Sequence, residues 1–232
     1  MKTIKTLLIR FNNELTQREV SQFRGAIIKK LDKPDVLFHH HIVDENKFRN
    51  KYPLIQYKTI NQKAALFCIE DGVESVQQFL NLDEWELQIG DKTVNIEIDY
   101  LKVNKFTIQA WDKYFSYKIY NWLALNNDNY KEYSKAKTDK DKIYILEKVL
   151  RGNILSFGKG IDCFFEHEVK VRIEHITKEK VLHYKDLKLH GIDAIVNTNV
   201  FIPNYIGLGK GSSMGFGVIK TINDKNIKKN EQ

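Results

Sequence analysis

Three adjacent histidines, His39, His40 and His41, are the residues of this 232-residue chain best suited to acid–base chemistry. An imidazole with an ordinary pKa of about 6.5 is present as both base and acid near neutral pH. Side chains alternate in an extended strand, so an extended segment from Phe38 to Val43 would place His39 and His41 on one face and His40 on the other. Two imidazoles on one face can divide the work of accepting and donating a proton.

A glycine-rich segment later in the chain is suited to binding phosphate. Residues 207–217 hold five of the twelve glycines. Glycine takes positive φ readily, and consecutive N–H groups in such a turn can surround phosphate oxygens. A Walker loop is excluded because Gly211, not Ser or Thr, follows Lys210. A dinucleotide-binding loop is excluded because a strand pattern, Val218 to Ile222, follows where a helix is required. The alternative is a glycine-rich hairpin that binds nothing.

Composition narrows the class of protein. The net charge of +7 favours an anionic partner such as RNA or DNA, and the hydrophobic fraction of 42% excludes global disorder. Cys68 and Cys163 lie in apolar runs and form no C-x-x-C pair, which is typical of buried thiols in a reducing compartment and argues against structural zinc. Neither a signal peptide nor an apolar stretch of eighteen residues occurs, so we expect a cytoplasmic protein without a membrane segment.

The first half of the chain predicts the order β-α-β-β-α-β of a ferredoxin-like module. A capping box, Thr16 with Glu19, begins a helix with apolar residues at helical spacing, and a second helix begins at Gly72. The predicted strands are Ile4 to Phe11, Leu54 to Ile60, Lys63 to Glu70, Trp85 to Leu87 and Thr93 to Tyr100.

The second half repeats this theme. Thr138 with Asp141 predicts the start of a long helix, whereas Asn126 to Lys137 is polar and predicts a loop. Strands are predicted at Phe106 to Gln109, Glu168 to Ile176 and Val218 to Ile222, with a hairpin within Val181 to Asn199, and Phe115 to Leu125 could be strand or helix. We therefore expect an α+β fold of two tandem ferredoxin-like modules with antiparallel sheets, at residues 1–102 and 103–224, followed by a basic tail at 225–232.

These segments resemble a known family. The pattern Gly-x-Gly, five residues, Gly-aromatic-Gly at the end of two ferredoxin-like modules is similar to the RAMP superfamily of CRISPR-associated proteins. Other segments resemble its sixth family, the repeat-processing endoribonucleases, and especially the b-type branch. They are Phe23 to Ala26, the three histidines, Tyr52 to Lys58, Leu125 to Tyr130 and Gly152 to Gly160.

The resemblance implies an enzyme that cuts CRISPR precursor transcripts within each repeat without a metal or other cofactor. RNA supplies its own nucleophile, the ribose 2′-hydroxyl, so one histidine would accept its proton and another would protonate the departing 5′ oxygen. The products would be a cyclic phosphate and a 5′-hydroxyl end. The partner is CRISPR repeat RNA. Subunits of a CRISPR effector complex and a second copy of the chain are further partners that the sequence leaves open.

The residues assigned to this chemistry fall into two sets. The catalytic candidates are His39, His41, His40 and Tyr52, with Tyr52 as a donor to the transition state or as ordinary core packing. The RNA-binding candidates are Gly207, Gly209, Lys210, Gly211, Ser212, Ser213, Gly215 and Gly217, with Arg24, Lys58 and Lys159 as possible phosphate ligands or structural ion pairs.

Three other interpretations stay open. The His-x-His pair could bind zinc with Asp44, Glu45 or His183. A noncatalytic RAMP subunit that holds guide RNA would keep the glycine-rich segment and have no use for the histidine pair. A general RNA-binding protein of RRM type would need an aromatic signature that Lys63 to Phe67 lacks.

Overall fold

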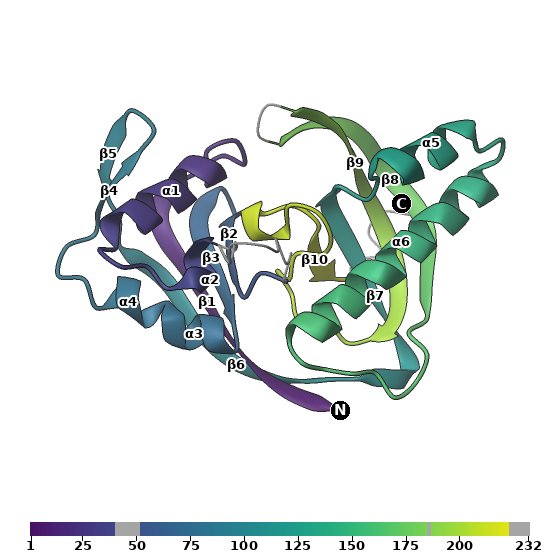
Figure 1. Ribbon diagram of the computed structural model, residues 1–232, viewed down its shortest axis with the longest axis horizontal. Helices are drawn as coiled ribbons and strands as arrows, with labels where there is room; N and C mark the ends of the chain where they lie inside the picture. The colour runs from purple at the N-terminus through teal and green to yellow at the C-terminus, as the bar shows by residue number, and fades with distance from the viewer. Residues whose placement is uncertain (40–51, 185–186, 223–232) are drawn as a thin grey trace, which may run out of the picture. The chain divides into compact units, whose positions relative to one another are not determined.

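The computed structural model describes residues 1–39, 52–184 and 187–222 (Figure 1). It has two compact units. The N-terminal unit comprises Thr3–Phe106 together with Ser213–Gly215, and the C-terminal unit comprises Met1–Lys2, Thr107–Ser212 and the described residues from Phe216 onward. Both are mixed α and β with antiparallel sheets, which confirms the predicted fold class. The predicted basic tail lies outside the described residues.

The sheet of the N-terminal unit has the strand order β2-β3-β1-β6. Its strands are β1 (Lys2–Glu14), β2 (Ile55–Ile60), β3 (Lys63–Ile69) and β6 (Ile98–Ile108). The helices are α1 (Val20–Lys30), α2 (Val36–His39), α3 (Asp71–Ser75) and α4 (Gln77–Leu80). This order, with α1 after the first strand and α3 and α4 after the third, is ferredoxin-like.

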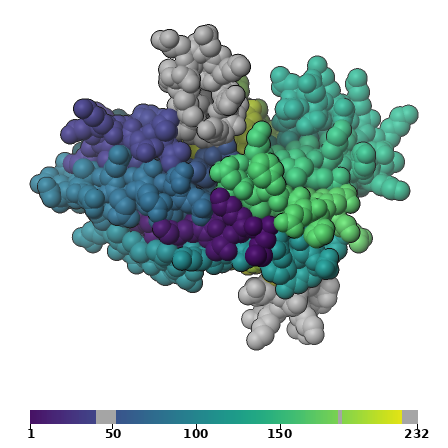
Figure 2. Space-filling view, turned by 60° about the horizontal axis from the view of Figure 1, so that its bottom comes forward, coloured from purple at the N-terminus to yellow at the C-terminus, as the bar shows by residue number. Residues whose placement is uncertain are grey.

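The core of this unit lies between the sheet and its helices. Helix α1 buries Phe23 and Ile27, whose spacing matches the helical period, against alternate residues of β1. Phe11 of β1 lies edge-on to Phe23 at 5.9 Å and to Phe79 at 6.1 Å between ring centroids. The space-filling view shows one outer face of this unit, coloured purple to blue (Figure 2).

The predicted strands between residues 85 and 100 need a correction. Strands β4 (Glu86–Ile89) and β5 (Lys92–Asn95) pair only with each other, as a separate hairpin around Gly90, which has a φ of +59°. The fourth strand of the main sheet is β6, which begins after Ile96 and Glu97 and continues beyond the predicted end at Tyr100. The sequence pattern from residue 93 to residue 100 therefore covers two strands with different partners, because β5 pairs with β4 and β6 pairs within the main sheet.

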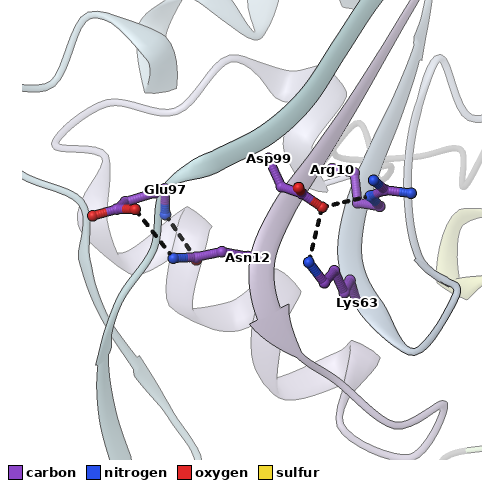
Figure 3. A network of polar contacts seen from close by, with 5 residues as sticks. All are labelled: Arg10, Asn12, Lys63, Glu97 and Asp99. Atoms are coloured by element: carbon purple, nitrogen blue, oxygen red, sulfur yellow. Dashed lines mark hydrogen bonds and ion pairs between the residues drawn. The ribbon is translucent and has the colours of Figure 1, made fainter.

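Polar contacts fix the edge strand β6 to the rest of the sheet (Figure 3). An Asp99 carboxylate oxygen lies 2.8 Å from Arg10 Nε of β1 and 3.0 Å from Lys63 Nζ of β3. The Lys63 ammonium and then the Arg10 guanidinium keep the pKa of Asp99 below its usual value. The Asn12 side chain exchanges two hydrogen bonds with Glu97, one of them from the Glu97 backbone N–H. These pairs specify one register for a strand whose side chains are mostly exposed.

The sheet of the C-terminal unit has the strand order β10-β7-β9-β8, the same permutation as in the first sheet. Its strands are β7 (Ala110–Trp122), β8 (Val171–Tyr184), β9 (Leu187–Val200) and β10 (Val218–Thr221). Helices α5 (Asn127–Lys135) and α6 (Asp139–Gly160) connect β7 to β8. Between β9 and β10, where the first unit has α3 and α4, this unit has the glycine-rich segment with the short 3-10 helix η1 (Ser212–Met214).

The starts of the two helices in this unit differ in how well the sequence predicted them. The capping box of Thr138 and Asp141 is present and begins α6 as predicted. The predicted loop at residues 126–137 is wrong, because the Asn126 side chain accepts a hydrogen bond from the Asn129 N–H and begins α5. Asparagine stabilises turns and helix N-termini by the same contact, so its presence did not decide between them. None of the helices in the described parts of the chain is long and apolar enough to cross a bilayer.

Candidate RNA-processing site

His39 is the last residue of the four-residue helix α2 and is partly buried. The sharing of one face by His39 and His41 was argued for an extended segment from Phe38, and that condition is not met at Phe38 and His39, because both are helical. His40 and His41 lie outside the described residues. The sharing of one face by His39 and His41 therefore stays a prediction.

Arg24, predicted to contact phosphate, lies on α1 beside the end of α2. Its Nε donates to the Phe38 carbonyl at 3.3 Å, and its Nη2 donates to the His39 carbonyl. The Tyr57 hydroxyl of β2 donates to the same Phe38 carbonyl at 3.4 Å, and the Arg24 guanidinium lies 5.9 Å from the Tyr57 ring centroid. A side chain of α1 and one of β2 thus bond to the backbone at the first histidine.

Tyr52 and Lys58 belong to a buried polar chain on the other face of β2. Gln56 Nε2 donates to the Tyr52 hydroxyl at 2.8 Å and to the Pro53 carbonyl at 3.2 Å. Lys58 Nζ donates to Gln56 Oε1 at 2.8 Å. Burial raises the pKa of Tyr52 and lowers the pKa of Lys58 to about 7. Lys58 has no exposed surface, and the burial of Tyr52 favours the core-packing alternative for that residue.

Four glycines of residues 207–217 have the positive φ that the sequence led us to expect. They are Gly209, Gly211, Gly215 and Gly217, with φ values from +62° to +80°. Gly207 has no positive φ, but a Cβ there would lie 2.9 Å from the Ser212 carbonyl oxygen. The segment therefore needs glycine for conformation at four positions and for space at the fifth.

Several backbone N–H groups of this segment bond within the protein. The Leu208 N–H donates to the Gly217 carbonyl, the Phe216 N–H to Gly211 and the Gly217 N–H to Asn121. Ser212 and Ser213 are buried, and the Ser212 N–H is directed to the Gly209 carbonyl at 3.4 Å. A phosphate cradle in this segment would have to use other amides, so the predicted role of these glycines and serines stays a prediction.

Lys210 is the exposed basic residue of the segment, and it lies in an aromatic setting in the C-terminal unit. Its Nζ lies 5.7 Å from the Tyr184 ring centroid, and the Phe216 ring stands edge-on to Tyr184 at 5.5 Å. A Cβ on Gly211 would lie 3.0 Å from both rings. An exposed ammonium beside a tyrosine ring can contact both a phosphate and a nucleobase.

The tip of the segment, Ser213–Gly215, belongs to the N-terminal unit. Gln17 Nε2 donates to the Met214 carbonyl at 2.7 Å, and Arg24 Nη1 lies 3.9 Å from Met214 Sδ. A Cβ on Gly215 would lie 3.1 Å from the Gln17 side chain and 3.2 Å from Lys58 Cβ.

Lys159, the remaining basic candidate, is exposed in the last turn of α6, where a cation complements the helix dipole.

Sequence reasoning missed Gln17, Gln56, Tyr57 and Met214 as members of this arrangement. One signal was available for Gln56. Strand β3 contains an unbroken apolar run, Ala64 to Ile69, which is typical of a strand buried on both faces. Polar residues on the adjacent strand are then expected to be buried too. Gln17 and Met214 carry no such signal, because the contacts of the Met214 carbonyl with Gln17 and of the Met214 sulfur with Arg24 join residues that are far apart in the sequence.

In the parts of the chain that the structure describes, no group of three or more His, Cys, Asp or Glu side chains is arranged to hold a metal ion. The zinc alternative involves His41, Asp44 and Glu45, which lie outside those parts.

Comparison with known proteins supplies the family. The model of the Cas6b N-terminal domain matches residues 2–107, and that of the Cas6b C-terminal domain matches residues 109–222. A crystal structure of Cas6b is 29% identical, with a TM-score of 0.83 over 95% of this chain and 100% of that chain. A crystal structure described as CRISPR RNA processing endoribonuclease Cas6b, 24% identical, has a similar fold, with a TM-score of 0.72 over 95% and 100% of the two chains.

An uncharacterized protein of Methanocaldococcus jannaschii is 34% identical over 135 residues, which cover 58% of this chain and 90% of that protein. The two family models together match nearly every described residue, in the order in which the two sheets follow each other. The resemblance stated from the sequence is confirmed: the chain belongs to the Cas6b family.

Proposed function

We propose that this protein cleaves CRISPR precursor RNA within its repeats by a reaction that needs no metal ion. The observation that carries the proposal is the match of both halves of the chain to Cas6b domains, supported by the similar crystal structure of an enzyme named for CRISPR RNA processing. The N-terminal unit contributes an anchored histidine at the end of α2. The C-terminal unit by itself contributes an exposed ammonium beside an aromatic ring.

The proposed reaction is an internal transesterification. One histidine of the cluster accepts the proton of the ribose 2′-hydroxyl, and the oxygen attacks the adjacent phosphorus. The bond from phosphorus to the 5′ oxygen breaks, and a second histidine donates a proton to that oxygen. One fragment ends in a 2′,3′-cyclic phosphate and the other in a 5′-hydroxyl. His39 and His41 are the proposed pair, with His40 as the alternative member.

A labelled repeat RNA distinguishes this reaction from others. In excess chelator we expect cleavage of the all-ribose RNA at one site and none of the same RNA with deoxyribose at that site, since the nucleophile is then missing. Cleavage that needs added metal, or that survives the deoxy substitution, would rule the mechanism out. Tight binding without any cleavage would support the noncatalytic guide-RNA subunit instead.

Variants extend the same assay. His39→Ala or His41→Ala should lower the single-turnover rate by roughly 10²–10⁴-fold with little change in RNA affinity, because a general acid or base is removed. His175→Ala, which alters an exposed histidine on β8, serves as the matched control and should cleave at the wild-type rate. Loss of binding in both histidine variants would mark these residues as RNA ligands rather than proton donors and acceptors.

A further inference from the structure

Arg24 joins three parts of the N-terminal unit. It lies on α1, donates to the carbonyls of Phe38 and His39 at the end of α2, and directs Nη1 toward the Met214 sulfur at the tip of the glycine-rich segment. Its guanidinium also faces the ring of Tyr57 on β2. It is partly buried, in contrast to Arg18 near the start of α1, which is exposed.

Helix α2 needs such a partner. A helix of four residues is far too short to be stable alone, so contacts from other elements must hold it in place. A guanidinium is planar and always charged, so one side chain can serve two adjacent carbonyls and also complement the negative end of the helix. A lysine offers one compact ammonium and cannot reproduce this two-point contact.

The same contacts make Arg24 poorly disposed to bind phosphate. Its Nε and Nη2 already donate to backbone carbonyls, and Nη1 faces a thioether. A bidentate phosphate contact would require at least two of these nitrogens and would release the backbone at His39. Tyr57 donates to the same Phe38 carbonyl, so the two side chains constrain one peptide from two elements.

We propose that Arg24 is a positioning residue for RNA cleavage: it fixes the backbone at His39, with help from Tyr57, and does not act as a phosphate ligand. This inference rests on the proposed function of the histidine cluster. Because Arg24 also contacts Met214, and Gln17 holds the Met214 carbonyl, the tip of the glycine-rich segment is fixed to the same side chain that orients His39.

The test compares Arg24→Lys and Arg24→Ala with the exposed control Arg18→Ala. Cleavage is measured in single turnover at saturating repeat RNA, and affinity is measured across a salt series. Both Arg24 variants should lose about 10- to 100-fold in rate, while their affinity and its salt dependence match the wild type. Arg18→Ala should cleave as the wild type does. A phosphate ligand would give the opposite pattern: Arg24→Lys near wild type, and Arg24→Ala with weaker binding and a salt slope reduced by about 0.7 to 0.9.

Two further measurements keep the outcome interpretable. Tyr57→Phe deletes only the hydroxyl that donates to Phe38 and should reduce the rate in the same direction but by less, without changing affinity. If an Arg24 variant fails to fold in a thermal melt, Tyr57→Phe decides, and a wild-type rate for it would overturn the proposal.

The NMR signal of the His39 ring in the RNA-free protein provides a readout that does not depend on catalysis. It should shift in Arg24→Lys and stay unchanged in Arg18→Ala. If the wild type does not cleave RNA, the proposed function fails while this shift still reports on the anchor. If the wild type cleaves and the shift is missing, the positioning role fails alone.

Discussion

At the scale of single residues, the least expected feature is an amine without solvent contact. Lys58 lies in the interior, where a charged ammonium is costly unless hydrogen-bonded, and Gln56 accepts its bond at 2.8 Å. The aliphatic part packs beneath Gly215, and the ammonium lies 5.4 Å from the Phe67 ring centroid. Desolvation outweighs these contacts, since the pKa of Lys58 falls to about 7.

This shift predicts a pH-dependent stability. The folded-state pKa is below the unfolded value of 10.5, so the unfolded state binds the proton more tightly between those limits. The contribution of Lys58 to stability is therefore least favourable at and below pH 7, and the free energy of unfolding rises as the pH increases from 7 toward 10.5. Lys58→Met should stabilise the protein at pH 7 and remove about 2 kcal/mol of the rise between pH 7 and 9.

Denaturant unfolding at both pH values measures the difference between wild type and variant. Lys29→Met, on the exposed side of α1, is the matched control and should leave the pH dependence unchanged. An identical pH dependence in wild type and Lys58→Met would mean that the amine is hydrated in solution.

At the scale of elements, the glycine-rich segment replaces the second helix of a ferredoxin-like module. Its path depends on backbone conformations and on close approaches that only glycine allows. At Gly217, with φ of +62°, an added Cβ would lie 2.0 Å from the Leu208 carbonyl oxygen, and the Leu208 N–H bonds to the Gly217 carbonyl. A methyl group there would break the closure of the segment onto β10.

Two glycine-to-alanine changes should therefore act in opposite directions. Gly217→Ala combines unfavourable φ with a backbone clash and should destabilise the protein by roughly 2–3 kcal/mol. Gly152 lies in α6 with open space where a Cβ would be, so Gly152→Ala should stabilise by about 0.5–1 kcal/mol. Unfolding free energies measured under one condition check both. A neutral Gly217→Ala would mean that the segment is not closed in solution.

The elements differ in how well the sequence predicted them. Strands β2 and β3 and the start of helix α6 were predicted almost to the residue, because apolar periodicity and a capping box are local signals. Helix α5 and the hairpin β4-β5 were not, since turn-forming and capping residues are the same types and pairing partners are not local. Of the candidate site, the need for glycine was predictable, but the bonds from Arg24 to α2 depend on elements brought together only by folding.

At the scale of the whole molecule, the net charge of +7 is the property most relevant to an RNA partner. Charge that is buried or paired within the protein does not bind phosphate, which applies to Lys58 and to the Arg10, Lys63 and Asp99 network. Exposed cations such as Lys210 and Lys159 remain available on the surface. Only a subset of the basic residues, those exposed and not paired with a carboxylate, is therefore expected to attract RNA.

This separation of buried from exposed charge predicts how RNA binding responds to salt. Each phosphate neutralised releases bound counterions, so a few contacts should weaken affinity roughly 10- to 100-fold between 50 and 200 mM salt. Lys210→Ala should weaken binding and reduce the slope by about 0.7, because an exposed ammonium is lost, whereas Lys58→Met should leave the slope unchanged. Binding titrations of repeat RNA over that range supply the slopes. If Lys210→Ala keeps the wild-type slope, Lys210 does not contact phosphate, and the predicted RNA-binding role of the glycine-rich segment loses its exposed cation.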